Sequence, residues 1–468
     1  GIPSTYTITV NPSPTVTVPA DITVCNNGSV ITTNFTSTPT GGTFSWTNSN
    51  TTIGLSASGS GDIASFTAIN IGVSPISATI TVVPSVNNCT GAPSTYTITV
   101  NPTPTVTVPA NITICNNDTV PATNFTSTPA GGTFSWINSN TAIGLSASGT
   151  GDIVSFTATN TGTSSISATI TVTPSVNNCN GTPSTYTITV NPTPTVIVPA
   201  NITVCNNGSV PSTNFTSTPA GGTFSWTNSN TAIGLSASGS GDIASFTATN
   251  TGTSPISATI TVTPDINNCS GTPSTYTITV NPSPGVTVPA DITVCNNGSV
   301  TASNFTSTPA GGTFSWTNSN TAIGIAASGT GDIPAFTATN TGTSPIMATV
   351  TVIPIVNSCP GTPSSYTIAV NPTPTVTVPA NITICNNGNV PASNFTSTPT
   401  GGTFTWTNSN TAIGLSANGS GDIAAFTASN SGTSPISATI TVTPFVNNCT
   451  GIPSTYTITV NPSPTVTV

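Results

Sequence analysis

The ten cysteines are the residues of this chain whose chemistry is easiest to specify. Each 90-residue period carries one early and one late member: Cys25 with Cys89, Cys115 with Cys179, Cys205 with Cys269, Cys295 with Cys359, and Cys385 with Cys449. An even, periodic set of cysteines in a polar, threonine-rich chain predicts disulfides formed in an oxidising compartment. A zinc site is a poor alternative, because the cysteines are solitary and the chain has no histidine.

Cysteine spacing leaves two pairings open. Cys25 and Cys89 are separated by 64 residues within one repeat, whereas Cys89 and Cys115 are separated by 26 residues across the joint between repeats. An extended connector would hold Cys89 and Cys115 apart, so the sequence favours the pairing within a repeat. A disulfide that closes such a loop adds on the order of 4 kcal/mol of stability. We therefore expect a structural rather than a catalytic cystine.

The charged residues offer little catalytic chemistry. All nine are aspartates, and the chain has no Lys, Arg, His or Glu, so no base stands beside the many serines. We expect neither an enzyme nor a cofactor. Asp62 and its equivalents Asp152, Asp242, Asp332 and Asp422 recur in a Gly-Ser/Thr-Gly-Asp-Ile turn. One carboxylate per repeat is too few for an ordinary calcium site, so a turn-forming role is favoured.

The composition also excludes two classes of partner. Without cationic side chains the chain cannot neutralise nucleic-acid phosphates or be attracted to anionic lipid. Apolar runs stay far below the roughly 20 residues that span a bilayer. We therefore expect no nucleic-acid binding and no membrane insertion.

The segment Thr95–Val108, TYTITVNPTPTVTV, recurs every 90 residues and sets the organisation of the chain. Its two runs of alternating threonine and apolar residues predict half-buried strands, and the Asn-Pro-x-Pro between them favours a short, stiff, extended connector. The period predicts five repeats with two end fragments, as in a window on a longer array. The expected divisions are 1–11 (last strand of a preceding repeat), 12–101, 102–191, 192–281, 282–371 and 372–461 (repeats 1 to 5), and 462–468 (first strand of a following repeat).

Each repeat is predicted to be an all-β, immunoglobulin-like antiparallel sandwich of seven or eight short strands, since turn signals are closely spaced and no segment has helical periodicity. In the second repeat the expected strands are Thr105–Val108, Asn111–Cys115, Val120–Thr126, Thr133–Trp136, Ile143–Ser148, one around Phe156, Ile166–Thr173, and one from Tyr186 to Val190. Trp136 lies on the same side as Phe134, so we expect the tryptophans to be buried. These core aromatics are Trp46, Trp136, Trp226, Trp316 and Trp406.

The motifs of each complete repeat resemble those of a known group. ITVCNNGSVP, FSWTNSN, GSGDI, SATITVTP, NNCTG and TYTITVNP are similar to motifs of the PKD-like, immunoglobulin-like repeats in giant surface adhesins of gliding and other Bacteroidota-type bacteria. This resemblance implies a seven-stranded sandwich, export by the type IX route, and display as long filaments or stalks, and it supplies no catalytic residues. The chain lacks the WDFGDG stretch of metazoan relatives, so their ligand habits are not expected here.

Glycosylation and self-association are the remaining expectations. Asn34 and Asn111 lie in Asn-x-Thr sequons, and Asp118-Thr119-Val120 resembles the O-glycosylation site of the same bacterial group. The sequence favours an extended rod acting as a structural stalk or filament of an adhesin at the outer cell surface. Its partners would be neighbouring repeats or other copies of the chain. The alternative is an array whose loops contact glycan, with abiotic surfaces as a further possible target.

Overall fold

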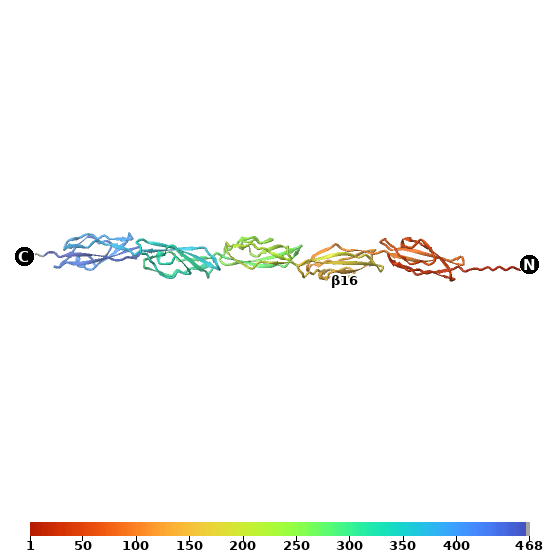
Figure 1. Ribbon diagram of the computed structural model, residues 1–468. Coiled ribbons are helices and arrows are strands. Elements are labelled where there is room, and N and C mark those ends of the chain that lie inside the picture. The colour runs from red at the N-terminus through yellow and green to blue at the C-terminus, as the bar shows by residue number, and fades with distance from the viewer. Residues whose placement is uncertain (465–468) are drawn as a thin grey trace, which may run out of the picture.

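The computed structural model describes residues 1–464 and shows five β-sandwiches arranged end to end as a rod, with the chain's two ends at opposite ends of it (Figure 1). The expected strand at 462–468 falls largely outside this description, since residues 465–468 are not part of it. Within residues 1–464 we find no helix with the length and apolar character required to span a bilayer.

The second repeat illustrates the elements of all five. Its strands and single 3-10 turn are β11 (Thr105–Thr107), β12 (Ile112–Cys115), β13 (Thr119–Val120), β14 (Thr126–Thr128), β15 (Thr133–Asn138), η2 (Thr141–Ile143), β16 (Ser148–Thr150), β17 (Phe156–Thr157), β18 (Ile166–Val176), β19 (Cys179–Asn180) and β20 (Ser184–Asn191). The other repeats run from β1 (Thr15–Thr17) to β10 (Ser94–Asn101), β21 (Thr195–Ile197) to β30 (Ser274–Asn281), β31 (Gly285–Thr287) to β40 (Ser364–Asn371), and β41 (Thr375–Thr377) to β50 (Ser454–Asn461).

Each sandwich has one large sheet and a layer of two smaller ones. In the second repeat the large sheet has the order β12-β20-β18-β15-β16, with β19 paired to β18, and the opposite layer consists of the pairs β11-β14 and β13-β17. All strand pairs lie within a single repeat. Most pairs are antiparallel, but β12 runs parallel to β20, with Ile112 opposite Ile188 and Cys115 opposite Asn191. The expectation of a purely antiparallel sandwich is therefore corrected at this one pair in every repeat.

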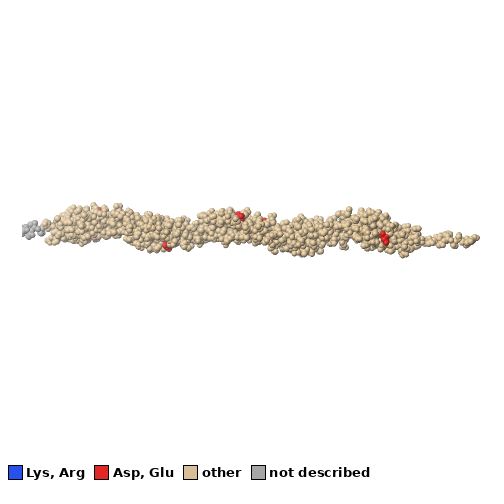
Figure 2. Space-filling model, viewed as in Figure 1, with Lys and Arg blue, Asp and Glu red and all other residues tan. Residues whose placement is uncertain are grey.

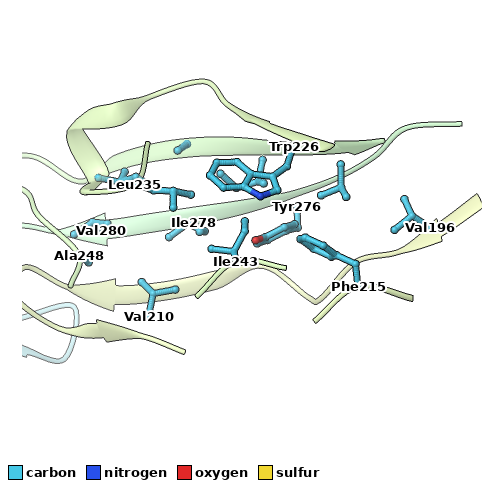
Figure 3. Close-up of a cluster of buried hydrophobic side chains, with 14 residues drawn as sticks. Val196, Val210, Phe215, Trp226, Leu235, Ile243, Ala248, Tyr276, Ile278 and Val280 are labelled. Carbon is cyan, nitrogen blue, oxygen red and sulfur yellow. The ribbon is translucent and has the colours of Figure 1, made fainter. Parts of the chain in front are cut away.

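The core of each repeat lies between these layers, because alternate residues of the long strands point inward. In the third repeat Trp226, Phe215 and Tyr276 point into the interior among aliphatic side chains (Figure 3). The five tryptophans are 7–8% exposed. Their burial agrees with the alternation of Trp136 and Phe134 along one strand, and it removes the indole rings from the surface.

Two sequence-based strand predictions differ from the structure in the second repeat. The stretch Ile143–Ser148 is not a strand, because η2 ends at Ile143 and Gly144 follows at a φ of 95°. Asn140 caps this turn by accepting a hydrogen bond from the backbone N–H of Ala142 at 3.1 Å. The predicted strand Val120–Thr126 is divided into β13 and β14, which belong to two different small sheets.

Candidate functional site: the joint between repeats

The joint begins where the large sheet of one repeat ends. In the first repeat β2 (Ile22–Cys25) runs parallel to β10, which places Cys25 directly opposite Asn101. Both residues therefore lie at the end from which the chain leaves the repeat. The backbone N–H of Asn26 donates a hydrogen bond to the carbonyl oxygen of Asn101 at 2.8 Å, which holds the two strand ends together.

The second half of the joint is a hairpin of the following repeat. β18 and β19 are connected by Asn177 and Asn178, whose φ angles are 50° and 62°. Two consecutive positive φ angles are typical of the type I′ turn, which favours asparagine and matches the twist of the flanking strands. Val176 pairs with Cys179 across the hairpin, so the cysteine follows the turn directly. The hairpin places Cys179 at the end of the second repeat that faces the first.

A disulfide connects the two halves. Cys25 is bonded to Cys179, with the Cα atoms 5.5 Å apart and a sequence separation of 154. The same separation recurs in Cys115–Cys269, Cys205–Cys359 and Cys295–Cys449. Each bond joins the early cysteine of one repeat to the late cysteine of the next. The favoured pairing within a repeat, Cys25 with Cys89, is therefore wrong, and so is the alternative of Cys89 with Cys115.

The direction of the strands explains this correction. β12 runs parallel to β20 and carries Cys115 to the far end of its repeat, whereas the β18–β19 hairpin holds Cys179 at the near end. The two cysteines of one repeat are thus separated by its whole length. A short separation in sequence is no guide here, because both cysteines lie at strand ends that point away from each other.

The connector is packed into the joint as well. Asn101 is 3% exposed and Pro102 and Pro104 are buried. The Pro104 carbonyl oxygen accepts a hydrogen bond from the backbone N–H of Thr182 at 2.9 Å. Gly181 lies so close to this carbonyl that a Cβ atom would collide with it. The connector is therefore anchored to the loop after β19 as well as stiffened by its prolines.

Side-chain amides complete the contact. Asn26 donates a hydrogen bond from Nδ2 to Oγ1 of Thr103 in the connector at 3.0 Å, and an equivalent bond recurs in every repeat. Across the first joint, Nδ2 of Asn177 donates to Oδ1 of Asn101 at 3.3 Å. The joint is thus covalent, buried and hydrogen-bonded, and it differs from a bare flexible linker.

The outer ends of the array present the same residues without a neighbouring repeat. Within residues 1–464, Cys89 and Cys385 are the two cysteines outside a disulfide. Pro12, the counterpart of Pro102, is exposed, and Cys89 is more exposed than Cys179, which is only 2% exposed. The burial of Pro102 and the deeper burial of Cys179 at the inner joints are therefore produced by the contact between repeats, whereas Pro14, the counterpart of Pro104, is buried at the outer end as well.

The remaining candidate residues have structural contacts or open surroundings. Asp62 accepts a hydrogen bond on Oδ1 from the backbone N–H of Phe35 at 2.8 Å, which ties its turn to the residue before β4 (Thr36–Thr38), and the other four repeats do the same. Asn34, Asn111 and Thr119 are exposed. No cluster of three or more potential metal-binding side chains occurs in the described part of the chain.

Asn111 also has a structural role that its sequon does not reveal. Its Oδ1 accepts a hydrogen bond from the backbone N–H of Thr187 at 2.8 Å. Asp291 occupies the same position in the fourth repeat, and the backbone N–H of Thr367 lowers the pKa of its carboxyl group. Both aspartate and asparagine occur at this position in the five repeats, because both supply the same acceptor oxygen.

Three of the repeats carry an equivalent shallow groove on their surface. In the second repeat it has a volume of about 570 Å³ and is lined by Phe125, Gly132, Phe134 and Asp152, among others, and it recurs in the third and fourth repeats. The buried tryptophans do not form a platform on it. The face of the molecule in Figure 2 shows few charged side chains, all of them aspartates.

Fold and joints together define a tandem array of β-sandwiches in which each joint is closed by a disulfide. Residues 112–194, 202–284 and 382–464 match the family described as the PKD-like domain, and these matches cover more than half of the chain. The chain therefore belongs to the PKD-like domain family. The matched segment 112–194 starts at β12, so it leaves out β11 and includes the connector after β20.

Comparison with curated proteins gives no match. Among solved structures, the Protocadherin GammaB4 extracellular domain aligns with 95% of this chain and 83% of its own, at 12% identity and a TM-score of 0.27. Sidekick-1 immunoglobulin domains 1–5 align over 96% and 99%, at 11% identity and 0.24, and the human Desmocollin-1 ectodomain over 90% and 92%, at 12% and 0.25. Scores of this size support no functional inference for this chain.

Proposed function

We propose that this chain is a non-catalytic structural rod, a segment of an extracellular stalk or filament whose task is to span distance. The observation that carries the proposal is the disulfide across each joint, Cys25–Cys179 and its three equivalents. A bond at every joint restricts bending between sandwiches that are already held by a packed connector. Cystines also point to an oxidising compartment outside the cytoplasm.

The resemblance of the repeat motifs to giant surface adhesins supports a place on the outer cell surface. On that reading the stalk projects an adhesive segment away from the cell. A surface made mostly of hydroxyl and amide groups, with few charges, fits this task, because its hydration depends little on salt and pH. Neighbouring repeats, or parallel copies of the same rod, are the partners that such a surface suits.

Electron microscopy of the oxidised chain tests the proposal. A strand such as β18 has 11 residues, so at about 3.3 Å per residue a repeat is about 36 Å long and five repeats extend to about 200 Å. We expect straight, narrow particles of that length, and small-angle X-ray scattering with a matching maximum dimension. Compact particles, or repeats folded back on one another, would contradict a rod.

Glycan binding along the array is the second candidate, and the recurring groove beside Phe134 is the feature that favours it. The test is a glycan array probed with the full oxidised chain and with a variant in which the groove phenylalanines are replaced by alanine. In the three repeats with the groove these residues are Phe134, Phe224 and Phe314. Binding that the variant loses would support this candidate, and the same binding by both proteins would remove it.

A further inference from the structure

The connectivity of the disulfides has a mechanical consequence beyond the shape of the rod. We infer that the four bonds divide the rod into two interleaved covalent strands, so that the array carries tension along them and lengthens far less when its repeats unfold than it would without the bonds. This inference rests on the proposed function as a rod and adds a task to it, which is to hold its length under a pulling force.

The first strand can be followed from one disulfide to the next. It passes from Cys25 through its disulfide to Cys179, along the chain to Cys205, and through a second disulfide to Cys359. The stretch from Cys179 to Cys205 enters the second repeat at one end and leaves the third repeat at the other. Only 26 residue steps therefore cross two whole repeats.

The second strand follows the same pattern one repeat out of phase. It runs from Cys89 to Cys115, through a disulfide to Cys269, along the chain to Cys295, and through a disulfide to Cys449. Between its two cysteines each repeat contains a body, such as residues 116–178, that belongs to neither covalent strand. A pulling force along the rod therefore has a covalent path that avoids these bodies.

The two covalent strands lie side by side in every repeat. In the second repeat β12 belongs to one strand and β20 to the other, and they form the parallel pair of the sheet. In the third repeat β22 (Ile202–Cys205) and β30 pair in the same way with the assignments exchanged. Both members point along the rod, so each covalent strand carries tension along its own length.

Little slack remains between consecutive disulfides. A stretch of 26 residues spans at most about 90 Å when fully extended. Two repeats, taken from the length of an 11-residue strand such as β18, occupy about 72 Å. The connector adds no reserve, since its prolines already hold it extended. Complete unfolding of the two repeats that such a stretch crosses would therefore lengthen those two repeats by only about a quarter.

Single-molecule force spectroscopy of the full chain, pulled from its two termini, tests the inference. Because Cys89 and Cys385 are outside a disulfide, neither covalent strand reaches both ends of the array, and the path crosses one body to change strands. In the oxidised chain the shortest covalent path follows 1–25, 179–205, 359–295 and 449–468, about 133 steps or about 470 Å. With the disulfides reduced, all 468 residues extend to about 1,600 Å. We expect reduction to increase the final extension about 3.5-fold.

Two cysteine variants test whether the connectivity of the disulfides, and not the folding of the repeats, limits the final extension. Removing one inner disulfide with C115S/C269S leaves a path of the same length, so the extension should stay near 470 Å. Removing both outer disulfides with C25S/C179S and C295S/C449S lengthens the shortest path to about 287 steps, and the extension should double to about 1,000 Å.

An oxidised chain that extends as far as the reduced one would overturn the inference. So would a large gain on removal of the inner disulfide alone. Either result could accompany rods of about 200 Å in micrographs, which would leave the proposed function standing. Compact particles in micrographs would instead remove the rod, whatever the force measurement gives.

Discussion

The interior of a repeat and the joint between repeats are stabilised in different ways. The interior buries Trp226, Ile260 and other apolar side chains, and its energy comes from removing apolar surface from water. The joint buries Asn101 and Pro102, closes with a cystine, and contains little apolar surface. The comparison shows that each 90-residue repeat encodes two separate tasks: folding of the repeat itself and fixing of its orientation relative to the next repeat.

The largest effect is expected in the interior. Replacing Trp226 with alanine should destabilise the third repeat by about 3–5 kcal/mol, because a large buried side chain leaves a cavity. In calorimetry about one fifth of the unfolding enthalpy should move to a lower temperature, since the other repeats keep their cores. I137T is the matched control: Ile137 is 60% exposed, four repeats carry threonine there, and the change should stay within about 0.5 kcal/mol. If the unfolding transition of all five repeats moved to a lower temperature together, the repeats and the joints would not be stabilised separately.

The next effect is expected at the joint. C205S/C359S should cost about 2–4 kcal/mol of stability, because a cross-link between distant residues no longer restricts the unfolded chain. The circular dichroism spectrum of the folded protein should stay the same, whereas X-ray scattering should report a shorter maximum dimension as the third joint bends. Loss of the β-strand signal from the spectrum would show that the disulfide is also required for the repeats to fold.

A smaller effect should follow from crowding the connector. Gly181→Ala places a Cβ against the Pro104 carbonyl, and such overpacking costs about 1–3 kcal/mol. The second repeat should melt earlier and the first joint should lose its straight geometry in micrographs. G285T provides the control, because nothing lies within 4 Å of a Cβ at that position and four repeats have threonine there. Equal losses in both variants would contradict a close contact at Gly181.

Alkaline pH should lower the stability of the repeat interior and leave the joint unchanged. Burial raises the pKa of the phenol groups above 10.0 in Tyr96, Tyr186, Tyr276, Tyr366 and Tyr456. Tyrosines of the unfolded chain ionise near that value while the folded ones stay protonated. Stability should therefore be constant up to about pH 10 and fall above it. Thermal melts followed against pH measure this, and a loss that starts well below pH 10 would contradict it.

The smallest effect is expected at the acidic end. Since the backbone N–H of Thr367 lowers the pKa of Asp291, the stability linked to this carboxyl group is present above its ordinary pKa of 3.8 and is lost as the pH falls through the lowered one. Asp291→Asn keeps the acceptor oxygen that Asn111 supplies in the second repeat. Acid titration of the variant should lose this part of the pH dependence, while its stability at neutral pH stays close to that of the unchanged chain. A larger loss at neutral pH would mean that the charge itself is needed.

The sequence predicted the all-β sandwich and its 90-residue period well, because alternation along strands and sparse residues such as Trp136 are local signals. It did not predict the parallel pair of β12 and β20, since alternation is the same in both directions. That omission led to the wrong cystine, because strand direction decides which end of the repeat holds Cys115. The Asn177-Asn178 turn was the available clue that Cys179 lies at the tip of a hairpin.

The distance in sequence between bonded cysteines also affects how the protein is made. The Cys25–Cys179 disulfide can form only after Cys179 has been synthesised. Cys89 and Cys115 are synthesised earlier and are closer to Cys25 in sequence, so they compete for it. During synthesis from the N-terminus, Cys25 can therefore react with two incorrect thiols before the correct one is made. Correct oxidation requires that folded repeats keep these thiols apart, so each repeat is locked to its predecessor only after it has itself been completed.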